Sequence, residues 1–248
     1  GAQFARGKVF VTEGGLRIPM IMRWPKRAKR GLVSEQMAST IDLLPTIISA
    51  AGCQVPRGLP GKDLRGVLGG QVAPLRTHLF GERNCDSADL HFPQRAVRDK
   101  RFKLIYTMLR DRPDPGAKKC LDNGASNFRG SPTHLDLNDA DARTRRIYDT
   151  WLNPPQYQLY DLDRDPHEFV NLAQEPDYQA IKRGLIDELE AWQRMTNDRL
   201  RFPEYLDRLT EENDACRRQG IRSPVGGWQY AGYLGTAESR HSEKLRSE

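Results

Sequence analysis

One segment near the N-terminus, residues 7–25, constrains the fold more than any other part of the chain. It contains Lys8, a short apolar run, the turn Glu13-Gly14-Gly15, a second apolar run over 18–24 and a closing Trp-Pro pair. Adjacent glycines allow positive φ and close backbone approach, so we expect the chain to reverse sharply at this turn. The apolar and β-branched residues 18–24 then predict a buried strand. Lys8 precedes the turn, where its side chain is expected to point into a cleft.

Residues 1–72 are interpreted as the end of an α/β domain. A helix is expected to begin near Asp42, because Pro45 is tolerated only in a first helical turn. It should end before Gly52, a residue suited to a helix C-terminus. Its predicted apolar face consists of Leu43, Leu44, Ile47 and Ile48.

Residues 73–200 are interpreted as a second, smaller unit built on an antiparallel sheet. Strands are predicted at 78–82, 95–98, 102–106 and 158–162, with a hairpin turn at 99–101. A terminal helix should pack on this sheet through a stripe of apolar residues spaced three and four apart: Ile181, Leu185, Leu189 and Trp192.

Two stretches of the chain read as irregular. The polar segment 110–153 is predicted to be a long loop, which in a compact domain is usually functional or disordered. Residues 201–248 are charged and are predicted to form an irregular tail. Three aspartates, Asp161, Asp163 and Asp165, resemble a calcium loop, but Pro166 follows where an EF-hand continues, so we favour a structural turn.

The composition of the chain limits which classes of binding partner are expected. The 248 residues carry a formal net charge of +6, but the basic residues are spread along the chain, which argues against nucleic acid as a partner. No apolar run approaches the ~18 residues of a membrane span, and no signal peptide is recognised at the start. The four cysteines, Cys53, Cys85, Cys120 and Cys216, lack metal-ligand spacing and cannot be paired into disulfides from sequence.

Three motifs in order give the chain a family resemblance. They are the segment 7–25, the run Ile41-Asp42-Leu43-Leu44-Pro45-Thr46, and Leu159-Tyr160-Asp161 leading into Asp165-Pro166-His167-Glu168. Together they resemble the C-terminal part of the sulfatase family, over roughly residues 4–198. Segments around 80–84 and 95–104 are similar to the heparan N-sulfatase-like and arylsulfatase-type branches. The resemblance implies an α/β fold of the alkaline-phosphatase-like type with a small antiparallel β-sheet subdomain packed by a C-terminal helix.

The resemblance also implies a mechanism whose central parts lie elsewhere. Sulfatases use a formylglycine nucleophile, made in a Cys/Ser-x-Pro/Ala-x-Arg motif, and a Ca²⁺ ion held by Asp and Asn residues. Neither has a match here. The nearest decoy, residues 53–57, has its proline one place too late. The nucleophile and the calcium ligands are therefore expected upstream, in a missing N-terminal part of the same protein, and this chain alone is expected to be inactive.

One catalytic position carries over by resemblance. The lysine of the Gly-Lys…Glu-Gly-Gly pattern faces the substrate sulfate in the family, and here it is Lys8, an ammonium suited to stabilising an anion. Without the motif, an exposed strand lysine would be the better interpretation. Further candidates for substrate binding follow the first strand of the small unit: Glu82, Arg83, Asn84 and His91.

The sequence therefore predicts a sulfatase acting on sulfuric esters or N-sulfates of a sulfated carbohydrate or small molecule. The family resemblance implies a periplasmic, secreted or lysosomal location. Two alternatives remain open: a phosphatase or phosphonate hydrolase of the same superfamily, and a non-catalytic module that binds anionic glycans through its basic surface.

Overall fold

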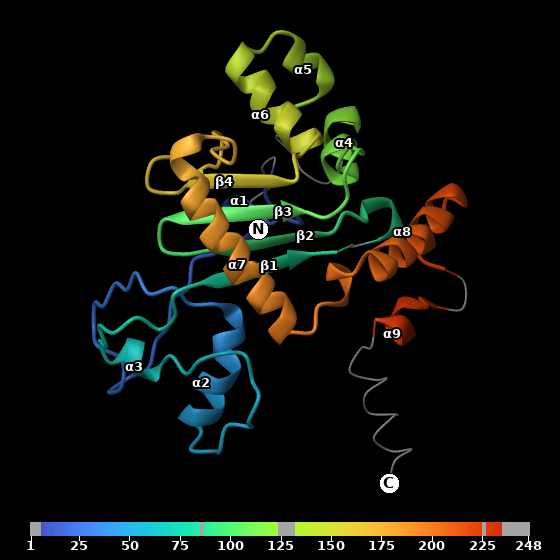
Figure 1. The fold of residues 1–248 in the computed structure, drawn as a ribbon. Helices are drawn as coiled ribbons and strands as arrows, with labels where there is room; N and C mark the ends of the chain where they lie inside the picture. The colour runs from blue at the N-terminus through green and yellow to red at the C-terminus, as the bar shows by residue number, and fades with distance from the viewer. Residues whose placement is uncertain (1–5, 85–86, 124–131, 225–226, 235–248) are drawn as a thin grey trace.

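An antiparallel sheet lies at the centre of the protein (Figure 1). The computed structural model describes residues 6–84, 87–123, 132–224 and 227–234. Its four strands lie side by side in chain order, and each pairs antiparallel with the next. They are β1 (Leu79–Arg83), β2 (Gln94–Arg98), β3 (Phe102–Thr107) and β4 (Tyr157–Asp161). The predicted strands and hairpin are confirmed, and the Asp99 carboxylate fastens the turn by accepting from the Phe102 N–H at 2.6 Å.

The long helix α7 (Gln179–Met195) crosses one face of the sheet (Figure 1). Leu185 and Leu189 are buried against Val97, Leu104 and Leu159, and Ile181 packs at the edge of this core. Trp192 stacks on Phe80 with ring centroids 5.1 Å apart. The predicted apolar stripe is therefore confirmed as the core-facing side of the helix.

The N-terminal segment covers the opposite face of the sheet. Val11 packs there against Ala96, Ile105 and Tyr160, and the short helix α1 (Glu13–Leu16) follows it. Successive side chains of a strand point to opposite faces of the sheet. Val97 and Leu104 therefore face α7, whereas their neighbours Ala96 and Ile105 face the N-terminal segment. The sheet is thus enclosed on both sides.

The strand predicted over 18–24 is wrong. This stretch has no regular structure, and Ile18, Met20 and Ile21 are 53%, 44% and 96% exposed. The described part of the chain contains one sheet, formed by β1–β4, so residues 18–24 have no neighbouring strand with which to pair.

The helix predicted near Asp42 is confirmed in position but not in orientation. The turn η1 (Thr40–Asp42) leads into α2 (Leu43–Ala50), and α3 (Arg65–Leu68) follows. Two residues of the predicted apolar face are exposed, Leu44 at 53% and Ile47 at 61%, and the other two, Leu43 and Ile48, are half-buried, whereas Thr46 is buried. The polar side faces inward because the Thr46 hydroxyl accepts a hydrogen bond from the Leu64 N–H at 2.8 Å.

The loop predicted at 110–153 contains helices, so its irregular character is wrong over their lengths. They are α4 (Pro115–Asn123), α5 (His134–Asn138) and α6 (Ala142–Leu152); residues 124–131 lie outside the described residues. Asp141 caps α6 by accepting from the Thr144 N–H at 2.7 Å. Trp151 on α6 packs edge-on against Phe10 at 5.2 Å, which anchors this region to the N-terminal segment.

The irregular tail predicted from residue 201 is also wrong over much of its length. The turn η4 (Arg199–Arg201) precedes α8 (Pro203–Arg218), and α9 (Tyr230–Tyr233) follows; residues 235–248 lie outside the described residues. Helix α8 buries Leu209 in a cluster with Met108 and Leu200. Two further short turns are η2 (Ala88–Leu90) and η3 (Pro176–Tyr178). Among the described residues, no helix is long and apolar enough to cross a membrane.

Candidate functional site

Lys8 lies on a tight loop, residues 6–12, whose backbone is strained. Arg6 has φ of 62° and Val9 has φ of 86°, which is rare for a β-branched residue. Such conformations cost of order 1–3 kcal/mol each and persist only where the surroundings hold them. Here the Thr12 hydroxyl donates to the Arg6 carbonyl, and Phe10 and Val11 are buried. The Lys8 side chain itself is exposed, so the expectation that it points into a cleft is not met by the described residues.

The diglycine of the motif acts through close approach. Neither Gly14 nor Gly15 has positive φ, so the sharp reversal expected there is wrong; both lie in the single turn of α1. A Cβ atom at Gly15 would lie 2.1 Å from the Phe10 carbonyl oxygen and 2.5 Å from that of Gly7. Only a residue without a side chain lets α1 pack this closely behind the Lys8 loop.

Glu13 fastens α1 to the sheet through a buried network of charges. Its carboxylate accepts from Lys103 Nζ at 3.0 Å and from Arg98 Nη1 at 2.6 Å. Glu168, from the Asp-Pro-His-Glu turn, pairs with Lys103 Nζ at 2.9 Å. The second Glu168 oxygen accepts from the Glu13 backbone N–H at 2.7 Å. One buried ammonium on β3 thus joins two motifs of the sequence.

The charge balance of this network keeps Glu13 ionised. Burial raises the pKa of Glu13, but the charges of Lys103 and Arg98 outweigh burial and lower it below its ordinary value. Two carboxylates and two cations meet in one place, and their hydrogen bonds give the network a defined geometry. These contacts tie Glu13, the residue at the start of α1, to β2, β3 and Glu168.

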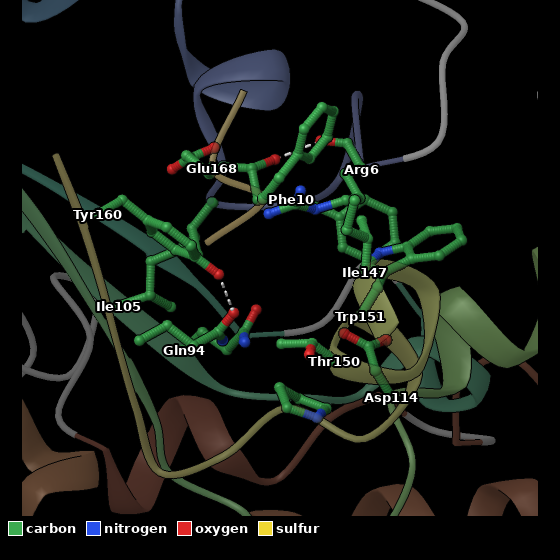
Figure 2. Close-up of a pocket in the computed structure, with 15 residues that line it drawn as sticks. Arg6, Phe10, Gln94, Ile105, Asp114, Ile147, Thr150, Trp151, Tyr160 and Glu168 are labelled. Atoms are coloured by element: carbon green, nitrogen blue, oxygen red, sulfur yellow. Dashed lines mark hydrogen bonds between the residues drawn. The ribbon is translucent and has the colours of Figure 1, made fainter. Parts of the chain in front are cut away.

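A small cavity lies between part of the loop and α6, beside the contact of Phe10 with Trp151 (Figure 2). Arg6, Phe10 and Glu168 lie on one side of it, and Gln94, Thr150 and Asp114 lie on the other. Its volume of about 20 Å³ suffices for a water molecule, which needs roughly 10–15 Å³, and is far too small for a sugar. Lys8 does not line it.

Arg83, a predicted substrate contact, has a structural role. Its side chain is buried and its guanidinium forms a two-pronged ion pair with Asp114, including Nη2 to Oδ1 at 2.9 Å. It also lies 4.9 Å from the centre of the Phe10 ring. Asp114 in turn accepts from the Gly116 N–H at 2.8 Å at the start of α4. The substrate-contact hypothesis for Arg83 is therefore replaced by one of support beneath the loop.

His91 is likewise buried, with no exposed surface for a substrate. Its Nε2 lies 3.1 Å from the Thr210 hydroxyl on α8, a partner within the segment predicted to be an irregular tail. Burial lowers the pKa of His91 to about 4, with the nearby cations Arg217 and Arg112 acting in the same direction and Asp214 opposing them. His91 is therefore neutral at ordinary pH and serves to dock α8.

Glu82 and Asn84 belong to a different surface from Lys8. Glu82 is opposite Arg95 in the sheet register, on the α7 side, and its carboxylate is largely exposed. Asn84 Oδ1 accepts from Arg95 Nη1 at 2.8 Å, while the same guanidinium pairs with Asp198 at 2.7 Å. The structure therefore does not bring the five predicted residues together. Cys85, beside Asn84, lies outside the described residues.

The described residues do not supply a metal site. No group of three or more His, Cys, Asp or Glu side chains among them is placed to hold an ion. In the aspartate-rich turn, Asp161 pairs with Arg101 through two hydrogen bonds of 2.7 and 3.0 Å, and Asp165 accepts from the Val170 N–H. These contacts agree with the structural turn preferred from the sequence. The residues on hand do not fit the Ca²⁺ of the family.

Sequence reasoning missed the residues that organise the site: Lys103, Glu168 and Arg98. The available signal was that Lys103 shares one face of its strand with Ile105, two residues along, because a face that carries such an apolar residue is expected to be buried. A carboxylate partner was then required, and the Glu of each motif was a candidate. What pattern cannot reveal is which carboxylates would meet that lysine.

Comparison with known proteins is consistent with these motifs. The profile of the family described as N-sulphoglucosamine sulphohydrolase, C-terminal, matches residues 4–112. An ulvan-active sulfatase of Formosa agariphila is 32% identical over 195 residues, covering 77% of this chain and 36% of that protein. The human N-sulphoglucosamine sulphohydrolase is 30% identical over 216 residues, covering 80% of this chain and 40% of that protein.

Among solved structures, one similar chain is an enzyme in complex with its substrate D-glucosamine-2-N,6-O-disulfate. The TM-score is 0.45 at 23% identity, over 71% of this chain and 28% of the other. In each comparison, the chain printed here spans about two fifths or less of the length of the protein it matches.

Proposed function

Because the chain belongs to the sulfatase family and corresponds to the C-terminal portion of its members, we propose that the whole protein is a sulfatase. It would hydrolyse a sulfuric ester or N-sulfate on a glycan or a small sulfated molecule. The names of the two curated relatives, one active on ulvan and one on N-sulphoglucosamine, favour a sulfated carbohydrate. The proposed place of action is the periplasm, the cell exterior or the lysosome.

The observation that carries the proposal is the way the Lys8 loop is held. An ammonium stabilises the negative charge of a sulfuryl group only where it is held close to the oxygens in advance. The strained backbone at Val9, the close approach at Gly15 and the buried Glu13–Lys103 pair all fix this loop. Lys8 is the exposed cation that they present, and we assign it to the substrate sulfate.

The remaining machinery is proposed to lie in an N-terminal part of the same protein. That part would contain the formylglycine nucleophile and the calcium ligands, which the described residues do not provide. Exposed apolar side chains at Ile21, Leu44 and Ile47 support a covering partner, because large apolar surfaces are seldom left to water.

The test is turnover of a sulfate ester by the intact protein. Lys8→Ala should lower kcat/KM by about 100-fold or more, the typical loss on removing one preorganised donor to a developing anion. Lys100→Ala is the matched control, because Lys100 is also an exposed lysine. Its turnover should stay near wild type. Both variants should unfold at the wild-type temperature, since neither side chain is buried.

Unchanged turnover in Lys8→Ala would overturn the assignment of that residue. The 248-residue chain by itself is expected to show no turnover, and measurable activity would contradict the proposed division of the machinery. A screen of the intact protein against sulfated mono- and disaccharides would then identify the substrate.

A further inference from the structure

A second, larger hollow lies on the face of the sheet opposite the Lys8 loop. Its volume is about 260 Å³, near the lower end of the roughly 300–1,000 Å³ of small-molecule sites. It lies between the ends of β3 and β4, the last turns of α7 and the start of α8. We call it the Tyr–Arg groove, after four of its lining residues: Tyr106, Tyr157, Arg194 and Arg201.

Two tyrosines from neighbouring strands form an aromatic part of the groove wall. Tyr106 and Tyr157 are directly opposite each other in the sheet register, and their rings stack at 5.2 Å with an angle of 22° between planes. Both are half-buried, so they combine a supported ring with an accessible part. Tyrosine suits such walls because it offers a rigid apolar surface together with a polar hydroxyl.

The rim of the groove is rich in arginine. Arg194 and Arg201 are exposed and line it directly, and the Arg201 guanidinium is held over the Phe202 ring at 4.2 Å. Lys182 adds a further cation, because its Nζ lies 5.5 Å from the centre of the Tyr157 ring. Positive charge therefore converges on the groove from several elements.

Glu190 is the one acidic residue among those that line the groove, and the two arginines Arg194 and Arg201 outnumber it, so the rim has a net positive charge. It pairs with Arg194 at 3.6 Å, and both side chains are more than half exposed. Such exposed pairs contribute little to stability, so a bound anion can replace Glu190 without a large loss. Within the described part of the chain, Arg201 has no ion pair, so binding an anion there would break none.

We propose that the Tyr–Arg groove is an accessory binding site for a sulfated oligosaccharide. A sugar ring would pack on the tyrosine wall, and sulfate groups would accept hydrogen bonds from the Arg194 and Arg201 guanidinium groups, whose planar fork matches an oxyanion. The site lies on the far side of the sheet from Lys8, so it would hold sugar units of the oligosaccharide that are distant from the unit at Lys8. This inference rests on the proposed function for the identity of the glycan, but its binding test does not require turnover.

The experiment measures binding of a heparin-derived hexasaccharide to the intact protein by calorimetry. The double variant Arg194→Ala/Arg201→Ala should raise the Kd at least 5-fold, and raising the salt concentration should weaken wild-type binding more than binding by the variant. The matched control is Arg27→Ala/Arg30→Ala, which removes the same charge from an exposed turn away from the groove. Its Kd should stay within 2-fold of wild type.

A second measurement separates this inference from the sulfatase assignment. Turnover of a sulfated monosaccharide should be unchanged in the groove variant, whereas KM for a sulfated oligosaccharide should rise with kcat retained. If neither the wild-type protein nor a variant turns over a sulfate ester, the proposed function is wrong. The binding measurement still tests whether the groove binds the hexasaccharide.

Several results would overturn the groove. An unchanged Kd in the double variant would show that the groove does not bind the hexasaccharide. An equal rise in the Kd of the control variant would show that binding depends only on the overall positive charge. A poly-glutamate peptide that binds more tightly than the hexasaccharide would make the groove a site for acidic protein segments. Lower thermal stability with lost monosaccharide turnover would mean that the rest of the protein packs there.

Discussion

The two faces of the central sheet are built from different chemistry. The face under α7 is apolar, with Val97, Leu104 and Leu159 packed on Leu185 and Leu189. The face under the Lys8 loop contains a buried lysine, Lys103, between two glutamates, with Arg98 beside them. The same strands supply both, because successive side chains point to opposite sides.

The two faces therefore have different roles: the apolar face stabilises the sheet, and the ionic face positions the Glu13 turn. Apolar burial stabilises by roughly 25 cal/mol per Å² with little dependence on direction, so the α7 face can hold the sheet together but cannot define a site finely. Charged groups must meet their partners in one geometry, or their desolvation is not offset. The ionic face therefore defines where the Glu13 turn lies, and through it the Lys8 loop.

The largest predicted effect comes from breaking the ionic face at its centre. Lys103→Met leaves Glu13 and Glu168 buried without their shared cation, which should cost about 3–5 kcal/mol in unfolding free energy. Leu104→Ala, its neighbour on the apolar face, should cost a similar 2–5 kcal/mol. Turnover measured where both variants remain folded should fall only for Lys103→Met. Equal turnover losses would mean that the two faces do not differ in role.

The next effect tests the close approach behind the loop. Gly15→Ala places a Cβ 2.1 Å from a carbonyl oxygen, whereas the nearest atom to a Cβ at Gly14 is 3.2 Å away. Gly15→Ala should therefore cost about 1–3 kcal/mol and lower turnover, and Gly14→Ala should cost less. Denaturant unfolding and kcat/KM of the two variants provide the comparison. The reverse order would contradict the packing described.

Acid should weaken the ionic face selectively. The pKa of Glu13 is lower in the folded protein than its ordinary 4.5, so the unfolded state binds its proton first as pH falls. The stability that Glu13 provides is thus complete above about pH 4.5 and is lost as pH falls through the lower folded value. Glu13→Gln should be less stable at neutral pH, with a shallower acid loss in thermal unfolding. An acid limb as steep as wild type would contradict this.

The smallest effect is expected at the exposed edge of the α7 side. Glu82 lies 3.8 Å from Arg95, whose main partner is Asp198. Glu82→Gln should change the unfolding free energy by less than about 1 kcal/mol, because an exposed, secondary ion pair contributes little. Asp198→Asn, which removes the buried partner, should cost several times more. Comparable losses for the two would show that the exposed pair had been undervalued.

A good part of this architecture is determined by the sequence alone. Alternating residues define the four strands, the three- and four-residue spacing defines the face of α7, and Pro45 defines where α2 begins. These features follow from local periodicity and backbone restrictions, which need no knowledge of distant neighbours. The sulfatase motifs belong to the same class, since their order along the chain is sufficient to recognise them.

Tertiary structure alone decided the rest. Glu13 and Lys103 are separated by 90 residues, and Glu13 and Glu168 by 155, so no local pattern could pair them. The inward polar side of α2, the burial of Arg83 and His91, and the ordering of α8 likewise depend on partners from other segments. A charged or polar group is buried only where another part of the chain satisfies it, and that requirement is met in space rather than in sequence.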